Sequence, residues 1–353
     1  MNLHFDTPSS FFLLACEAND AIAPEPARTK DRTLLLYAVA DNNLRYYSDS
    51  LKNMVGCIDM VGANSNLVLY LDNGDSCNLY QRDDNSGCLR FVRTFGDRNS
   101  LDEANMKEVF NLVRKEYPAK EMGLILWSHG TGWLPTGRAT RSFGDDKGEA
   151  ADIHAIANSL TGLEYDYLIF DACYMGCLEV AWELRDAAKY IVTSPAEVPI
   201  RGVIGNADTI EQLLDDGDIS NRLRKICNKY VDTNEMYIMG KSISVVDANK
   251  LKTVASKLRN EPVTSKTISA EQLKHYEFRG QMLFFDAKDV FGAIGRDSLF
   301  SECVVYANCD DRNESHWCGL SVFVPIDKNE AYHQNYQTLS WNESTGWMDI
   351  FGR

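Results

Sequence analysis

Two residues suited to nucleophilic catalysis each follow a short apolar run. Residues 124–127 read Leu-Ile-Leu-Trp and lead through Ser128 to His129, and residues 167–170 read Tyr-Leu-Ile-Phe and lead through Asp-Ala to Cys173. Such runs, closed by turn-forming residues, indicate strands buried on both faces, as in a parallel sheet. Because ligands bind at the carboxyl edge of open α/β sheets, we expect His129 and Cys173 to share one crevice. A thiol and an imidazole there form a nucleophile and its acid–base partner.

The residues next to this pair support the same chemistry. Cys173 precedes a predicted helix at 174–187, and the partial positive charge of a helix N-terminus favours a thiolate. The alternative is a buried cysteine that only packs, which is the role we expect for Cys177. Gly130 has no side chain to block substrate from the backbone, so we expect the N–H groups of Gly130 and Cys173 to form an oxyanion hole. The sequence shows no second close Cys/His pair, which argues against a zinc site.

Strands and helices must alternate to place these two residues at one edge. Strands are expected at 33–39, 66–72, 122–128, 165–170 and 190–193, with helices at about 41–60, 101–117, 150–160 and 174–187 and a hairpin off the sheet at 77–93. In the first helix region, the Asp-Asn-Asn that begins at Asp41 is interpreted as a turn and helix cap. The alternation predicts right-handed crossovers and a parallel sheet between helical layers.

The pattern changes after about residue 205. Helices are expected at 207–215, 218–231, 248–259 and 297–308, with strand-like runs at 242–246 and 319–325 that would extend the first sheet. We therefore divide the chain into a signal or tether segment at 1–31, a catalytic core at 32–205 and a smaller, mainly helical subdomain at 206–353.

Charge and composition narrow the class of protein. The chain has 353 residues, ordinary globular composition and a net charge of −15, which disfavours nucleic acid and anionic membranes as partners. Ten cysteines are too few for a disulfide scaffold in a chain of this length. Cys77 and Cys88 flank one polar loop, and Cys309 and Cys318 flank another, so each pair is either bridged or free.

The N-terminus bears on where the protein works. Residues 13–16, Leu-Leu-Ala-Cys, resemble a bacterial lipoprotein signal with Cys16 as the lipid-bearing residue, and the polar stretch at 17–31 suits a tether. Residues 1–10 lack Lys and Arg, and the apolar stretch is short for a signal peptide. We favour an exported protein over a cytosolic one. It would be periplasmic or at the cell surface, either free or held by a lipid anchor at Cys16.

Taken together, these motifs resemble the clostripain family of cysteine peptidases, which belongs to the clan of caspases, gingipains, legumain and separase. The matching segments are residues 37–44, the Ser-His-Gly-Thr-Gly-Trp run at 128–133, the Asp-Ala-Cys at Cys173 and the strand at 319–325. The resemblance covers about residues 33–325. It implies a caspase-like α/β/α sandwich around a mostly parallel sheet.

The resemblance also assigns roles to individual residues. It implies an endopeptidase that cleaves after Arg or Lys, with Cys173 as nucleophile and His129 as its partner. Asp171 matches an acidic position associated with the pocket for the basic side chain, although it could instead cap a helix. Glu197, in the loop after the strand at 190–193, would be a second acid. The runner-up is a catalytically silent caspase-like binding protein.

Relatives of this kind are activated by a cut in the loop after the catalytic histidine. Here that loop, 130–149, contains Arg138, Arg141 and Lys147, and we expect processing after Arg141 or Lys147. Alternatively, these three basic residues are solvated surface charges with no role in processing. We expect a monomer without a cofactor. Some relatives depend on calcium, but the clusters at 145–146 and 215–218 lack a complete ligand spacing, so no calcium site is assigned.

Overall fold

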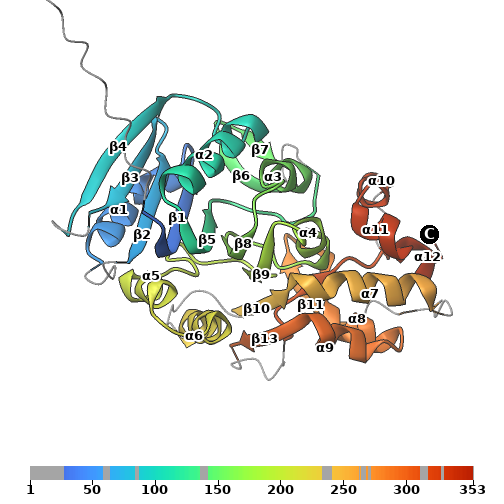
Figure 1. Cartoon of the computed structure of the whole chain (residues 1–353). Helices are drawn as coiled ribbons and strands as arrows, with labels where there is room; N and C mark the ends of the chain where they lie inside the picture. Colours follow the sequence, from blue (N-terminus) through green and yellow to red (C-terminus); the bar gives the residue numbers. More distant parts are fainter. Residues whose placement is uncertain are drawn as a thin grey trace, which may run out of the picture.

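A nine-stranded sheet forms the centre of the molecule (Figure 1). The structure, a computed structural model, describes residues 28–58, 64–83, 87–135, 142–232, 241–261, 263, 268, 272–310, 317–326 and 330–352. The strand order is β13-β10-β9-β8-β5-β1-β2-β3-β4. The strands are β1 (Lys30–Val39), β2 (Ser65–Asp72), β3 (Cys77–Arg82), β4 (Leu89–Gly96), β5 (Ala119–Trp127), β8 (Tyr165–Asp171), β9 (Ala188–Thr193), β10 (Ser242–Asp247) and β13 (Val304–Cys309).

The five central strands, β2, β1, β5, β8 and β9, are parallel, and the strands on either side of them are antiparallel. Strands β5 and β8 end in register, because Trp127 pairs with Asp171. The residues that follow both strands therefore leave the sheet at the same edge.

Helices cover both faces of the sheet, as Figure 1 shows. Successive residues of β1 face opposite sides, so Leu35 and Tyr37 belong to one core while Leu34 and Leu36 belong to the other. The first core is covered by α2 (Glu103–Glu116), α3 (Ile153–Ser159), α4 (Leu178–Glu183) and α7 (Ala248–Asn260). The second is covered by α1 (Ser48–Gly56), α5 (Ala207–Leu214) and α6 (Ile219–Asp232). The predicted α/β/α sandwich with a mostly parallel sheet is confirmed.

The C-terminal part differs from the prediction in two places. The helix expected at 297–308 ends early, as α9 (Asp297–Cys303), and its remainder forms edge strand β13 beside β10. The β-branched and aromatic residues of Val-Val-Tyr at 304–306 favour a strand there. The run at 319–325 does not extend the main sheet: β14 (Ser321–Val322) pairs with β12 (Gln281–Asp286), which pairs with β11 (His275–Phe278). The hairpin expected off the sheet is instead its edge, as β3 and β4.

The C-terminal elements support the segment that follows Cys173. Ser321 donates its backbone N–H to the carbonyl oxygen of Gly176 at 2.8 Å. The buried carboxyl of Glu179, on α4, accepts hydrogen bonds from Phe323 N at 2.9 Å and from the Tyr336 hydroxyl at 2.6 Å. Tyr336 lies on α10 (Glu330–Gln337), which precedes α11 (Ser340–Thr345) and α12 (Trp347–Ile350). Burial raises the pKa of Glu179 to about 7, although these hydrogen bonds lower it.

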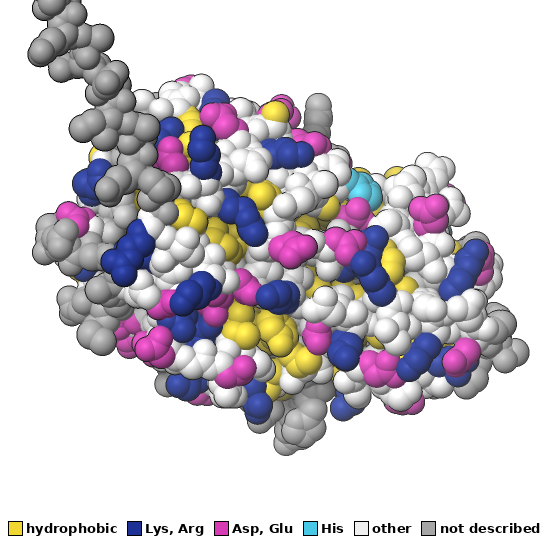
Figure 2. All heavy atoms as spheres, in the orientation of Figure 1, with side chains coloured by type: hydrophobic (Ala, Val, Ile, Leu, Met, Phe, Trp, Pro, Cys, Tyr) yellow, Lys and Arg dark blue, Asp and Glu magenta, His cyan; other side chains and the backbone are white. Residues whose placement is uncertain are grey.

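The surface mixes charges of both signs. Figure 2 shows basic and acidic side chains interspersed on the displayed face, with apolar side chains exposed between them. Within the described ranges, every helix is too short or too polar to cross a membrane. Cys77 and Cys88 are not bridged to each other, nor are Cys309 and Cys318.

Candidate active site

The structure brings His129 and Cys173 to one edge of the sheet. Each lies two residues beyond its strand, β5 or β8, and these two strands are neighbours. Their loops touch: a Cβ atom on Gly130 would lie 2.5 Å from the carbonyl oxygen of Cys173. Only a residue without a side chain allows the two backbones to approach this closely.

The Cys173 thiol is held by the loop that follows β9. Its Sγ accepts a hydrogen bond from Val198 N at 3.3 Å and lies 3.7 Å from the carbonyl oxygen of the same residue. Burial raises the pKa of Cys173 to about 11, and the charges of Glu197 and Asp171 add to the increase, while the bond to Val198 lowers it. The thiol is therefore neutral near pH 7 in this state and needs a base to remove its proton.

The expected helix directly after Cys173 is wrong. Helix α4 begins at Leu178, and the intervening residues form a turn in which Tyr174 adopts a left-handed φ of 58°. The positive end of a helix is therefore one turn too far along the chain to lower the pKa of Cys173. Tyr174 is fixed instead by its hydroxyl, which donates to Glu277 O at 2.8 Å, and by stacking on Phe284. This strained residue sets the direction of the backbone that presents the thiol.

His129 is anchored through its backbone and its ring. Its carbonyl oxygen accepts from Gly144 N at 2.8 Å, on β6 (Phe143–Asp146), which pairs with β7 (Glu149–Ala151). The ring Nε2 lies 2.6 Å from Oδ1 of Asn43. Asn43 was not among the predicted site residues. The signal was present in the sequence, because Asn43 follows the carboxyl end of β1, at the same edge as His129 and Cys173.

Two backbone amides at this edge, those of Gly130 and Cys173, are the predicted donors of the oxyanion hole. Within the described part of the chain, the N–H groups of Gly130 and Cys173 have no hydrogen-bond acceptor. Gly130 lies opposite Phe143 in an antiparallel β-bridge. The hydrogen bonds of this bridge are made by the adjacent residues: Thr131 N donates to Ser142 O at 3.0 Å, and Gly144 N donates to His129 O. An oxygen that develops negative charge could accept from both amides.

Asp171 lies beneath a loop. Its carboxylate accepts from Val203 N at 2.8 Å and from Ile204 N at 3.1 Å, and any side chain on Gly202 would collide with it. Burial raises the pKa of Asp171 to about 7, while these two amides lower it. Asp171 therefore caps no helix but holds the segment at 202–204 in place. The helix that follows this segment, α5, is capped by the side chain of Asn206.

Glu197 is an exposed acid beside Cys173. It lies in the loop after β9, and its negative charge raises the pKa values of both Cys173 and Tyr174. A cationic group arriving at Cys173 would meet this carboxylate without any rearrangement of the backbone.

A cavity of about 470 Å³ opens next to this edge, between α1, the end of β5 and the loop before α5. Its floor includes Trp127, the cross-strand neighbour of Asp171. Its lining residues are Tyr47, Ser50, Leu51, Met54, Trp127, Ile200, Arg201, Ile204, Gly205, Asn206 and Ala207. The cavity suits an apolar or long side chain of a bound peptide.

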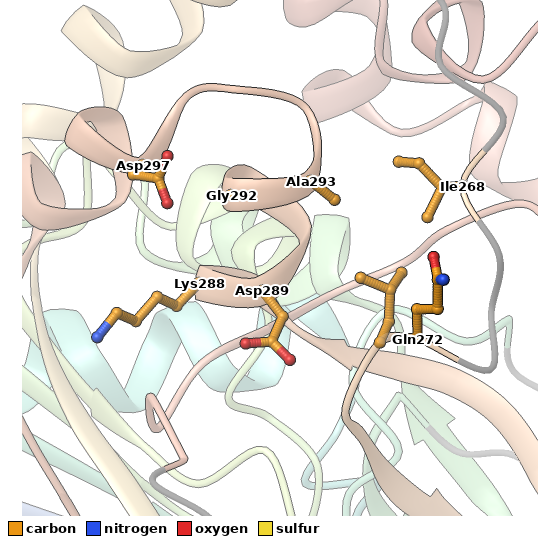
Figure 3. Close-up of a pocket in the computed structure, with 8 residues that line it drawn as sticks. Ile268, Gln272, Lys288, Asp289, Gly292, Ala293 and Asp297 are labelled. Carbon is orange, nitrogen blue, oxygen red and sulfur yellow. The ribbon is translucent and has the colours of Figure 1, made fainter.

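A separate cavity of about 540 Å³ lies against α8 (Ala287–Ala293), as Figure 3 shows. Its lining residues are Ile268, Gln272, Leu273, Lys288, Asp289, Gly292, Ala293 and Asp297. In Figure 3, Lys288 and Asp289 project from α8, and the Asp297 carboxylate points toward the turn that carries Gly292. These described lining residues include neither Cys nor His, so they offer no thiol–imidazole pair.

The residues expected in the processing loop are only partly visible. Arg138 and Arg141 lie outside the described residues. Lys147 lies in the two-residue turn between β6 and β7 with a φ of 51°. Its Nζ lies 2.7 Å from Asp97 Oδ1 and 3.2 Å from Asp41 Oδ2.

The structure adds no evidence for a calcium site. Among the candidate calcium ligands, Asp146 is buried and accepts a hydrogen bond from Ser100 N. Burial and the neighbouring Asp72 raise the pKa of Asp146 to about 7, although the bond from Ser100 lowers it. No group of three acidic, His or Cys residues in the described ranges is arranged to hold a metal ion.

Comparisons with known proteins identify the family of this chain. The sequence profile of the Clostripain family matches residues 36–344. A secreted C11 cysteine protease from Bacteroides thetaiotaomicron, solved with an irreversible peptide inhibitor, is 23% identical over 90% of this chain and 99% of that one, with a TM-score of 0.78. An inactive zymogen C11 protease from Parabacteroides distasonis is 25% identical over 90% and 99% of the two chains, with a TM-score of 0.74.

Another structure of a secreted C11 cysteine protease from Bacteroides thetaiotaomicron, iotapain, is 19% identical over 92% of this chain and 99% of that one, with a TM-score of 0.75. No curated protein matches the chain. The family profile covers most of the sequence and includes both His129 and Cys173. The chain therefore belongs to the clostripain family of cysteine peptidases, which are hydrolases that act on peptide bonds.

Proposed function

We propose that this protein is an endopeptidase that cleaves after Arg or Lys with Cys173 as nucleophile and His129 as acid–base partner. The observation that supports it is the contact between the loops after β5 and β8, which places both residues at one edge in a clostripain-family chain.

The chemistry follows from these two side chains. Sγ of Cys173 gives its proton to His129 and bonds to the scissile carbonyl carbon, whose oxygen becomes an oxyanion held by Gly130 N–H and Cys173 N–H. The C–N bond then breaks, and the leaving amine takes the proton from His129. Water attacks the resulting thioester and gives a proton to His129. Release of the acid breaks the C–S bond and returns that proton to the thiol.

A basic side chain before the cut would meet two carboxylates. Glu197 is exposed beside Cys173, whereas Asp171 is covered by the backbone at 202–204. Glu197 is therefore the direct partner in the state described, and Asp171 becomes one when that segment moves. Arg should be favoured at least as much as Lys, because its guanidinium pairs with carboxylate through two hydrogen bonds.

Peptides that differ only in the residue before the cut test this specificity. The wild type should prefer Arg and Lys. Glu197→Gln should lower kcat/KM for the Arg peptide roughly tenfold, because it weakens one hydrogen bond between charged groups. Glu164→Gln is a matched control, because Glu164 is exposed at the opposite end of β8. A preference for Asp or for an apolar residue would overturn the assignment.

We further propose that the loop after His129 is cut during activation, at Arg141. One chemical argument and one structural observation favour Arg141 over Lys147 as the processing site. The Arg fork fits a carboxylate better, and Lys147 is held in a tight turn by Asp97 and Asp41 rather than in an extended segment that a protease could bind. The Parabacteroides distasonis neighbour, described as an inactive zymogen, supports an activation step of this kind.

Intact-mass measurement decides the processing proposal. The wild type should yield a short N-terminal and a longer C-terminal fragment, Lys147→Gln should be cut like the wild type, and Arg141→Gln should stay whole. The Cys173→Ala protein, purified alone, should also stay one chain if the cut is made by the protein itself. A wild type that is uncut yet fully active would eliminate the proposal, and a cut Cys173→Ala protein would implicate another protease.

We also propose that the protein is exported, as a monomer. Two solved structures of C11 proteases that resemble this chain are described as secreted, and they support export. The proposed lipid attachment at Cys16 lies outside the described residues.

A further inference from the structure

We propose that Asn43 is a positioning residue for catalysis, the third member of a Cys173–His129–Asn43 arrangement. The inference rests on the proposed peptidase function. It starts from the contact of 2.6 Å between His129 Nε2 and Asn43 Oδ1.

This contact fixes the protonation of the ring. An amide oxygen can only accept, so Nε2 of His129 carries the proton and donates it to Asn43. The other ring nitrogen, Nδ1, is then the atom that takes the Cys173 proton and returns it to the leaving amine. A base oriented by a third group is the general arrangement of an activated nucleophile.

The loop that carries Asn43 is held by its neighbours on both sides. Asn42 caps the following turn, since its Oδ1 accepts from Leu44 N at 2.8 Å, and its Nδ2 donates to Asp145 O at 2.6 Å. Asp41 O accepts from Lys147 N at 3.1 Å. Asn42 therefore performs the capping expected of this sequence, which leaves the Asn43 amide for the histidine.

The same hairpin holds both partners of the contact. Strand β6 binds the backbone of His129 through Gly144 N and binds the Asn43 loop through Asp145 O. At this junction Lys147 forms ion pairs with both Asp41 and Asp97. Asn43 is exposed, but its position relative to His129 is set by buried backbone and not by a freely moving surface loop.

Three variants test the proposal in peptide turnover. Asn43→Ala removes the acceptor and should lower kcat about tenfold with KM within twofold, because the substrate does not bind the amide. Asn43→Asp keeps an acceptor and should stay within about threefold of wild type at its optimum. Its added charge should move the acid limb of the pH profile upward by roughly one unit, because a nearby carboxylate stabilises imidazolium. Arg45→Ala is the matched control, since Arg45 is exposed in the same segment and pairs with Asp75.

A second measurement needs no turnover and separates this proposal from the peptidase assignment. In the Cys173→Ala background, NMR titration of the His129 ring should show a pKa raised by about one unit in Asn43→Asp and unchanged in Arg45→Ala. A loss of kcat below threefold in Asn43→Ala would overturn the proposal. So would an Asn43→Asp protein as slow as Asn43→Ala with the pKa of His129 unmoved. If the wild type cleaves no peptide, the peptidase assignment fails, and the titration still decides whether Asn43 positions the ring.

Discussion

The Cys173→Ala protein is expected to show no measurable peptidase activity while it keeps the wild-type fold. The substitution removes the proposed nucleophile, and the next thiol along the chain, Cys177, is buried in the core. The thiol contacts the backbone of Val198 through two weak sulfur hydrogen bonds, so its loss should cost little stability. Hydrolysis of an Arg peptide and the thermal unfolding midpoint measure the two effects.

Cys177→Ala is the matched control. It removes a buried thiol from the same turn and should keep its activity while losing some stability through the small cavity that it leaves. Activity of Cys173→Ala within tenfold of wild type would point to another nucleophile. A loss of folding together with activity would show that the thiol is structural.

The raised pKa of Cys173 adds a pH dependence to this result. A group with a pKa of about 11 is almost entirely thiol at pH 7, so the thiolate fraction should rise nearly tenfold for each pH unit up to that value. Alkylation of Cys173 by iodoacetamide in the uncut protein should follow the same slope. A rate that is already level near pH 7 would mean that His129 forms the thiolate before substrate binds.

The sequence predicts that His129 and Cys173 lie at one edge of the sheet because both positions depend on local patterns. The apolar runs that end before His129 and Cys173 are long enough and rich enough in Leu and Ile to indicate buried parallel strands. Strands β5 and β8 are neighbours in register, so the two chain segments meet at one edge. Strand–helix alternation likewise predicts the sandwich.

The parts that could not be predicted depend on contacts between distant segments. Asn42 and Asn43 are identical in type and adjacent in sequence. Only the position of β6 shows that Asn42 caps the turn that follows and that Asn43 contacts His129. The sequence predicts Asp171 as an accessible acid in a substrate pocket, but the backbone of Val203 and Ile204 covers its carboxylate in the structure. Strand β13 is set by its pairing with β10, a tertiary contact that overrides the helical pattern before it.

His129→Ala is expected to lower peptide turnover by about 10²–10⁴-fold, the usual contribution of a positioned acid–base group. The leaving amine of a peptide must be protonated as the C–N bond breaks, and His129 is the group assigned to supply that proton. His154→Ala is the control, because His154 lies on α3 and pairs with Glu183 at 3.0 Å, and this variant should turn over peptide like the wild type.

Alkylation of the same proteins separates the two proposed roles of His129, which are to remove the thiol proton and to protonate the leaving amine. An alkylating agent has no amine to protonate, so its reaction with Cys173 depends only on how readily the thiol loses its proton. The rate should therefore fall less than turnover in His129→Ala, and the difference measures the acid step. If both rates fell equally, His129 would act mainly by generating the thiolate. That result is expected if Cys173 stays buried, and its pKa stays raised, when substrate is bound.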